Sequence, residues 1–182
     1  MRRTVRWQTW GGEGLEHLEI WQDADAIHAD GMLIGHGSTP YALHYRLRCD
    51  AHWHCRNACL TLVGSGERLE LHSDGRGNWQ DGEGRPLAAL RGCIDLDITA
   101  TPFTNTLPIR RLGLGAGAAQ TVRVAWVKVP TLDVEAVDQR YTCLQPGGRY
   151  RFEGLRNRCE YELAVDADGL VTEYPSLFRR LI

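Results

Sequence analysis

Apolar and polar residues alternate with a period of two along much of this chain. The pattern is clearest in segments 41–49, 53–63 and 159–165, where we expect the odd-numbered residues to share one face. Because successive side chains of a β-strand point to opposite sides, this alternation is typical of antiparallel strands with one buried face. The three segments therefore predict a sheet with one face toward a core or cavity and the other toward water.

Turn signals separate such segments at hairpin spacing. The pair Asp-Gly, which favours tight hairpin turns, occurs at residues 30–31, 74–75, 81–82 and 168–169. Helical periodicity is scarce, and only residues 176–181 are expected to form a short helix. Residues 69–75 resemble residues 162–169, which a duplicated sheet unit and ordinary hairpin chemistry explain about equally well. No linker divides the chain, so we predict one mainly β domain over residues 1–182.

Composition and charge narrow the range of partners. The chain has 21 Lys and Arg against 23 Asp and Glu, and this near balance gives no reason to expect nucleic acid as a partner. The basic N-terminus is not followed by an apolar run, and no apolar segment is long enough to cross a membrane. The six cysteines have no framework spacing and are expected to be reduced thiols. We therefore expect a cytoplasmic protein.

The segment 92–112 carries polar residues that packing alone does not explain. Asp95 and Asp97 occupy alternate positions in an apolar strand, so their carboxylates would share one face with Cα atoms about 6.5–7 Å apart. That spacing suits an acid–base pair or a shared cation. It equally suits a strand face whose carboxylates pair with nearby arginines.

Two prolines, Pro102 and Pro108, bracket the next part of this segment. Proline disfavours helical geometry in the residue before it, so we expect a constrained loop between two strands. Its hydroxyl and amide groups would suit sugars or neutral head groups, and they would equally well satisfy the loop's own backbone. Arg110 and Arg111 are expected on opposite faces of the following strand, one of them turned inward to hold an anion or to pair with an aspartate. The candidate ligand-binding residues here are Asp95, Asp97, Thr101, Phe103, Thr104, Asn105, Thr106, Arg110 and Arg111.

Other reactive residues do not form a recognisable centre. His52 and His54 would lie on one face of a strand and Cys55 and Cys59 on the other, and zinc-type cysteine spacing is absent. No nucleophile motif or phosphate-binding loop is present. We therefore assign no catalytic residue, no metal and no cofactor.

The run Gly-Cys-Ile-Asp-Leu-Asp-Ile at residues 92–98 and the run Thr-Pro-Phe-Thr-Asn-Thr-Leu-Pro-Ile-Arg-Arg-Leu at residues 101–112 closely resemble the signature of a bacterial glycolipid-binding family, formerly a domain of unknown function. Further motifs match in order at residues 45–56, 74–79, 127–130, 139–142 and 166–178. The resemblance implies a single domain of curved antiparallel sheet, a half-barrel or open barrel with a partly apolar cavity, similar to bacterial lipoprotein carriers. It also adds Tyr141 to the candidate ligand-binding residues.

Three functional hypotheses follow. The first is non-catalytic binding of a lipid or glycolipid in a cavity lined by the sheet. The second is a hydrolase or other enzyme that acts on a sugar or lipid ester through Asp95 and Asp97. The third is a module that forms a homodimer or docks a partner, because an open sheet leaves strand edges that proteins usually cover.

Overall fold

The computed structural model describes residues 2–37 and 39–182. The first half of the chain forms β1 (Arg2–Thr9), β2 (Leu15–Gln22), β3 (Ala26–His36), β4 (Pro40–Asp50), β5 (Cys55–Leu62), β6 (Arg68–Ser73) and β7 (Trp79–Asp81). The second half forms β8 (Asp95–Ile98), β9 (Ala119–Val127), β10 (Val134–Gln145), β11 (Arg149–Gly154), β12 (Cys159–Val165), β13 (Val171–Tyr174) and β14 (Phe178–Arg180). The helices are η1 (Ala88–Leu90), η2 (Phe103–Asn105) and α1 (Thr106–Leu112).

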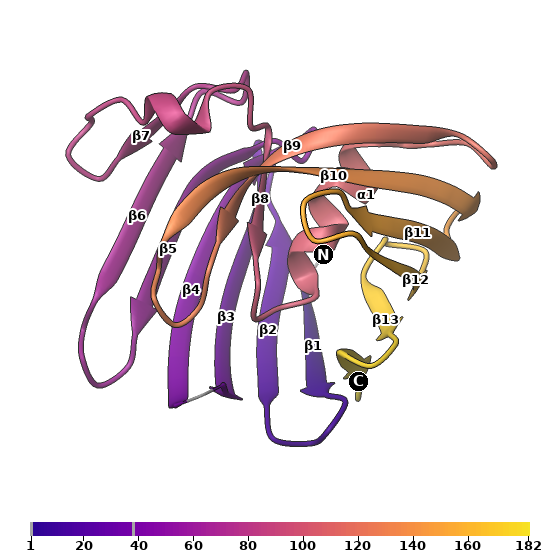
Figure 1. Ribbon diagram of the computed structural model, residues 1–182, viewed down its shortest axis with the longest axis horizontal. Helices are drawn as coiled ribbons and strands as arrows, with labels where there is room; N and C mark the ends of the chain where they lie inside the picture. The colour runs from indigo at the N-terminus through magenta and orange to yellow at the C-terminus, as the bar shows by residue number, and fades with distance from the viewer. Residues whose placement is uncertain (1, 38) are drawn as a thin grey trace.

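All 14 strands belong to one sheet, in the order β7-β6-β5-β4-β3-β2-β1-β14-β13-β12-β11-β10-β9-β8. The first and last strands of the chain therefore pair in the middle of the sheet, and β7 and β8 are its outer strands. Neighbours are antiparallel except for β8 and β9, which run parallel. The sheet curves strongly without closing (Figure 1). This confirms the predicted fold class, a curved and unclosed antiparallel sheet with little helix.

Alternation predicts the buried face of β4 correctly and that of β5 incorrectly. In β4 the odd-numbered residues from Leu43 to Cys49 are buried, as expected. In β5 the buried residues after Cys55 are even-numbered, from Ala58 to Leu62. The β4–β5 register explains the change, because Cys49 lies opposite Cys55 while Arg48 lies opposite Asn57. Arg56 is therefore an extra residue, a β-bulge that moves every later side chain to the other face.

One aspartate-centred turn recurs in the chain. Its carboxylate Oδ1 accepts hydrogen bonds from the backbone N–H groups two and four residues later, which satisfies donors that the turn would otherwise leave unpaired. The turn occurs at Asp50, Asp74, Asp81 and Asp166. Two of these turns begin in the similar segments 69–75 and 162–169, at Asp74 and Asp166, where β6 and β12 end. Both segments therefore lead from a strand into a turn of the same kind.

The segment from β8 through η2 and α1 lies inside the curve of the sheet, between the strands of the first and second halves (Figure 1). Leu96, Ile98 and Phe103 pack in the apolar cluster of the first half of the sheet. Ile109 packs in the cluster beneath β10–β13. The segment is thus the core element that both halves of the sheet cover.

The helices in this segment correct the expected loop and strand. Pro108 is the third residue of α1, where the backbone N–H has no acceptor within the helix in any case, so proline costs no hydrogen bond. The helix ends at Gly113, whose φ of 53° and ψ of 40° are left-handed. The expected C-terminal helix at residues 176–181 is also wrong, because Phe178–Arg180 is strand β14, held beside β1.

The connection from β7 to β8 fastens the two outer strands to each other. Trp79 of β7 donates its indole N–H to the carbonyl of Cys93 at 2.7 Å, and the backbone N–H of Gly92 donates to the carbonyl of Gly77 at 2.8 Å. A Cβ on Gly77 would lie 2.9 Å from the Cα of Gly92. This close approach of two backbones requires glycine at position 77.

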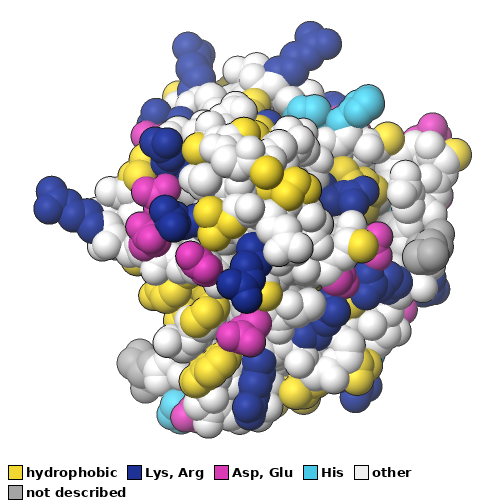
Figure 2. Space-filling view, turned by 90° about the vertical axis from the view of Figure 1, so that its right-hand side faces the viewer, with side chains coloured by type: hydrophobic (Ala, Val, Ile, Leu, Met, Phe, Trp, Pro, Cys, Tyr) yellow, Lys and Arg dark blue, Asp and Glu magenta, His cyan; other side chains and the backbone are white. Residues whose placement is uncertain are grey.

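The outer face of the second half carries paired charges. Across β11 and β12, Arg149 and Arg151 approach Glu160 and Glu162. Figure 2 shows basic and acidic side chains intermixed, with small groups of apolar side chains between them, on the side of the molecule that it presents. Paired charges of this kind are typical of a surface in contact with water. We therefore expect a site for an apolar ligand on the concave face of the sheet.

We expect Asp166→Ala to lower the free energy of unfolding by about 2 kcal/mol, because two turn N–H groups would lose their acceptor. Asp166 also pairs with Arg180 at 2.6 Å and Arg3 at 3.0 Å. Asp168→Ala is the matched control. Asp168 is half-exposed and pairs only with Arg3 among the described residues, so its loss should be below about 1 kcal/mol. Urea unfolding at pH 7 checks both, and equal losses would contradict the role of the turn.

Candidate ligand-binding pocket

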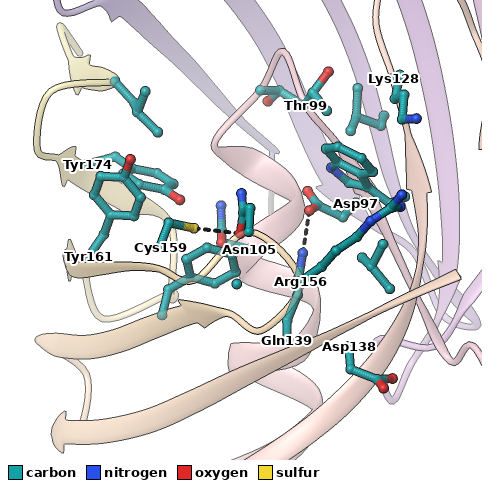
Figure 3. A pocket seen from close by; sticks show the side chains of 18 of the residues that line it. Asp97, Thr99, Asn105, Lys128, Asp138, Gln139, Arg156, Cys159, Tyr161 and Tyr174 are labelled. Atoms are coloured by element: carbon teal, nitrogen blue, oxygen red, sulfur yellow. Dashed lines mark hydrogen bonds between the residues drawn. The ribbon is translucent and has the colours of Figure 1, made fainter. Parts of the chain in front are cut away.

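A pocket of about 540 Å³ opens where the β8–α1 segment meets the second half of the sheet (Figure 3). Its lining has three chemically different parts. We name them the polar floor (Asp97, Thr101, Asn105 and Gln139), the aromatic wall (Phe152, Tyr161, Tyr174 and Phe178) and the charged rim (Lys128, Glu135 and Arg156). In Figure 3, Tyr161 and Tyr174 lie on one side of Asn105 and Asp97, and Arg156 and Lys128 lie on the other.

Hydrogen bonds hold the polar floor rigid. Gln139 donates to Asp97 Oδ2 at 2.6 Å, and Thr104 donates to Asp97 Oδ1 at 3.0 Å. The hydroxyl of Tyr141 donates to Asn105 Oδ1 at 2.9 Å. Burial raises the pKa of Asp97, although the hydrogen bonds from Gln139 and Thr104 oppose that rise. The floor is a preorganised set of polar groups at the base of the cavity.

The aromatic wall is an edge-to-face cluster centred on Tyr174. Its ring centroid lies 5.1 Å from that of Tyr161 and 6.2 Å from those of Phe152 and Phe178. Such geometry is favourable for aromatic pairs and fixes the orientation of each ring. Burial raises the pKa of the Tyr174 hydroxyl strongly. The wall therefore presents a firm, largely apolar surface to the cavity.

The charged rim is internally paired. Glu135 contacts Arg156 and lies 2.6 Å from the Lys128 ammonium. Hydrogen bonds from Arg156 and Lys128 lower the pKa of Glu135. The Lys128 ammonium also lies 5.3 Å from the ring centroid of Trp126, which lines the same pocket. Both cations of the rim are thus engaged before any ligand arrives.

The structure brings half of the residues predicted from sequence to this pocket. Asp97, Thr101 and Asn105 line it, and Thr104 and Tyr141 support its floor through the hydrogen bonds given above. Phe103 is part of the apolar core. Thr106 is buried and donates to the carbonyl of Gly169 at 3.0 Å, which ties α1 to the β12–β13 turn.

Asp95 and the two arginines lie elsewhere. Arg111 holds Asp95 through two hydrogen bonds, Nε to Oδ1 at 2.9 Å and Nη2 to Oδ2 at 2.5 Å, and the Asp95 side chain has no exposed surface. Arg110 points away from this pair, and its guanidinium lies 5.4 Å from the ring centroid of Trp53. It lines a separate pocket of about 120 Å³. Asp95 and Asp97 therefore do not face one cavity as an acid–base pair.

Several lining residues were not predicted. Gln139 lies in a matched motif, at residues 139–142, and Tyr161 lies in an alternating row, so each had a weak signal in the sequence. Tyr174 and Phe178 lie in the matched motif at residues 166–178, and Lys128 lies in that at residues 127–130. The other lining residues had no such signal, because their strands come together only in the folded sheet; they are Trp126, Glu135, Phe152 and Arg156.

The described part of the chain has neither a metal-binding cluster nor a membrane-spanning helix. Within residues 2–37 and 39–182, no group of three or more His, Cys, Asp or Glu side chains is arranged to hold a metal ion. Helices long and apolar enough to cross a membrane are absent from the described part of the chain.

A buried carboxylate, Glu16, lies behind the polar floor. Thr101 donates its hydroxyl to Glu16 Oε1 at 2.8 Å, and Tyr45 donates to the same oxygen. Glu16 Oε2 has no hydrogen-bond partner among the described residues. Burial raises the pKa of Glu16 to about 7, against the hydrogen bonds from Tyr45 and Thr101 that lower it. This carboxylate links the floor to β2 and β4.

The raised pKa of Glu16 predicts a pH-dependent stability. The pKa of Glu16 is 4.5 in the unfolded chain and about 7 in the folded protein. Between these two pH values the Glu16 carboxyl is protonated in the folded protein and ionised in the unfolded chain. The free energy of unfolding therefore falls as the pH rises from 4.5 to 7. The loss should reach about 3 kcal/mol by pH 8. Glu16→Gln should remove that slope, so the difference between variant and wild type should grow from pH 4.5 to pH 8. Urea unfolding across this range checks it, and parallel curves would contradict it.

Arg111→Ala should lower the free energy of unfolding by about 3 kcal/mol, because it leaves the Asp95 carboxylate buried without a partner. Arg110→Ala is the matched control on the same helix. Arg110 is exposed, so its loss should cost below about 1 kcal/mol. Denaturant unfolding of both variants at pH 7 measures the difference. Similar losses would show that the Asp95–Arg111 pair does not hold the segment.

Comparison with known proteins agrees with the fold and identifies the family. A solved structure of a DUF1089 family protein from Pseudomonas aeruginosa is 41% identical, with a TM-score of 0.86 over 93% of this chain and 92% of that chain. A search of curated proteins finds no match. The model of the family described as "Putative glycolipid-binding" matches residues 4–180. Because that match spans nearly the whole sequence, this chain belongs to the "Putative glycolipid-binding" family.

Proposed function

We propose that this protein binds a lipid or glycolipid in the pocket between the β8–α1 segment and the second half of the sheet, without transforming it. The observation that carries the proposal is the pocket itself. Its volume of about 540 Å³ falls within the range of roughly 300–1,000 Å³ that is usual for small-molecule sites. It combines an apolar wall with a few fixed polar groups, which is the composition of a site that binds and orients an amphipathic ligand.

The same contacts favour binding over hydrolysis. Both carboxylate oxygens of Asp97 already accept hydrogen bonds from the protein. The ion pairs of Glu135 with Lys128 and Arg156 keep it ionised and make it a poor proton acceptor. Asp95 is engaged with Arg111 and lies outside the pocket. The cytoplasm stays the predicted compartment, and a homodimer stays a predicted assembly.

Native mass spectrometry of protein purified without detergent should show a bound lipid that is lost on denaturation. A preorganised site that combines an apolar wall with fixed polar groups should retain its ligand through purification. An apo mass, together with an unchanged melting temperature across a panel of lipids and glycolipids, would contradict the proposed function.

Thiol labelling locates the ligand. Cys159 lines the pocket, with its Sγ 3.1 Å from Asn157 Oδ1, whereas Cys59 is a half-buried thiol of β5 outside it. Ligand in the pocket should slow alkylation of Cys159 by iodoacetamide and leave that of Cys59 unchanged. Peptide mass spectrometry reads both sites in one sample. Protection of both thiols, or of neither, would count against binding in this pocket.

A further inference from the structure

We propose that the group held in the pocket is an uncharged sugar ring, and that the alkyl part of the ligand stays outside. This inference rests on the proposed function, because it assigns the part of the ligand that the same pocket recognises. It follows from three properties of the lining: the hydrogen bonds that the floor can still make, the surface of the wall, and the balance of charge around the rim.

The polar floor offers both donors and acceptors within one small area. Asn105 uses one amide N–H on the carbonyl of Pro102, and Gln139 uses one on Asp97. Each side-chain amide has a second N–H to offer, and the Asp97 carboxylate has more lone pairs than its two donors use. Adjacent sugar hydroxyls, each a donor and an acceptor, match such a mixed set.

An alkyl chain in the same place would leave these groups without partners. Floor groups cut off from water by methylene groups would each lose a hydrogen bond, and Asp97 is already buried enough to have a raised pKa. A site that hydrogen-bonds hydroxyl groups therefore rejects a ligand that lacks them. The aromatic wall provides the apolar complement, since the C–H faces of a sugar ring can lie against Tyr161 and Tyr174.

Charge selects against anionic head groups. The charged residues that line the pocket are three carboxylates, Asp97, Glu135 and Asp138, and two cations, Lys128 and Arg156. Both cations are engaged by Glu135. A phosphate or a uronic acid would therefore meet an excess of negative charge, with both cations already shared with Glu135, whereas an uncharged ring would meet no such penalty.

Short soluble probes test this directly. Methyl glycosides of glucose, galactose, mannose and N-acetylglucosamine would be titrated by calorimetry and by protection of Cys159 from iodoacetamide. At least one of these methyl glycosides should bind. The octyl glycoside of the same sugar should bind no more than about tenfold tighter, because its alkyl chain stays outside the pocket. Octanol and octyl phosphate should not protect Cys159.

A charged analogue and a single substitution test the charge argument. Methyl β-D-glucuronide, compared with methyl β-D-glucoside, should bind at least about tenfold more weakly to the wild type. Glu135→Gln releases Lys128 and Arg156, so it should narrow or reverse that difference. An unchanged melting temperature for the variant would show that the fold is intact. A glucuronide that binds the wild type as well as the glucoside would overturn the selection for an uncharged ring.

Other outcomes separate this inference from the proposed function. If octanol or octyl phosphate protects Cys159 and the methyl glycosides do not, the pocket binds the alkyl chain or an anionic group of the ligand. This inference is then wrong, whereas the proposed binding of a lipid stands. If no probe and no lipid extract protects Cys159, this inference and the proposed function are both wrong.

Asp97→Asn should weaken binding of the glycoside at least about tenfold. An unchanged affinity would show that the polar floor does not contact the sugar.

Discussion

A carboxylate without solvent contact, that of Asp95, and the guanidinium of Arg111 hold the middle of this chain in place. A buried charge is tolerated only when it is paired, so β8 and α1 are required to meet at the distance that two hydrogen bonds set. The pair holds α1 beside β8 within the connection that leads to β9. In this position, Leu96 and Ile98 pack in the apolar cluster of the first half of the sheet and Ile109 packs in that of the second half.

The pocket is a consequence of this arrangement. Asp97 follows Asp95 by two residues on the same strand and so faces the same side, where Gln139 of β10 meets it. The floor is braced from behind as well, because Thr101 hydrogen-bonds Glu16 of β2. A ligand that reaches the floor would thus touch groups whose positions depend on both halves of the sheet.

The sequence predicts local patterns well and tertiary contacts poorly. The alternation in β4 identifies its buried face, but the pattern in β5 fails because one extra residue, Arg56, reverses the faces. The rule for residues before proline predicts an extended chain at Leu107, yet packing makes it helical because Pro108 lies where a helix needs no N–H. Pairing of one arginine with an aspartate is among the alternatives expected from the sequence. The sequence does not identify the pair, because Arg111 meets Asp95 only through the turn of helix α1. The aromatic wall and the rim come from β9 to β14, so no local pattern could group them.

The order of strands has a topological consequence. Every neighbouring pair in the sheet joins strands that are consecutive in the chain, except β1 and β14. A circular permutant that began at β8 and ended at β7 would therefore pair every strand with its neighbour in the chain, as a meander from β9 onward, with its ends at the two edges of the sheet. In the natural order, the ladder between β1 and β14 forms only after β14 has been synthesised. Until then, no strand ladder of the described residues joins the first half of the sheet to the second.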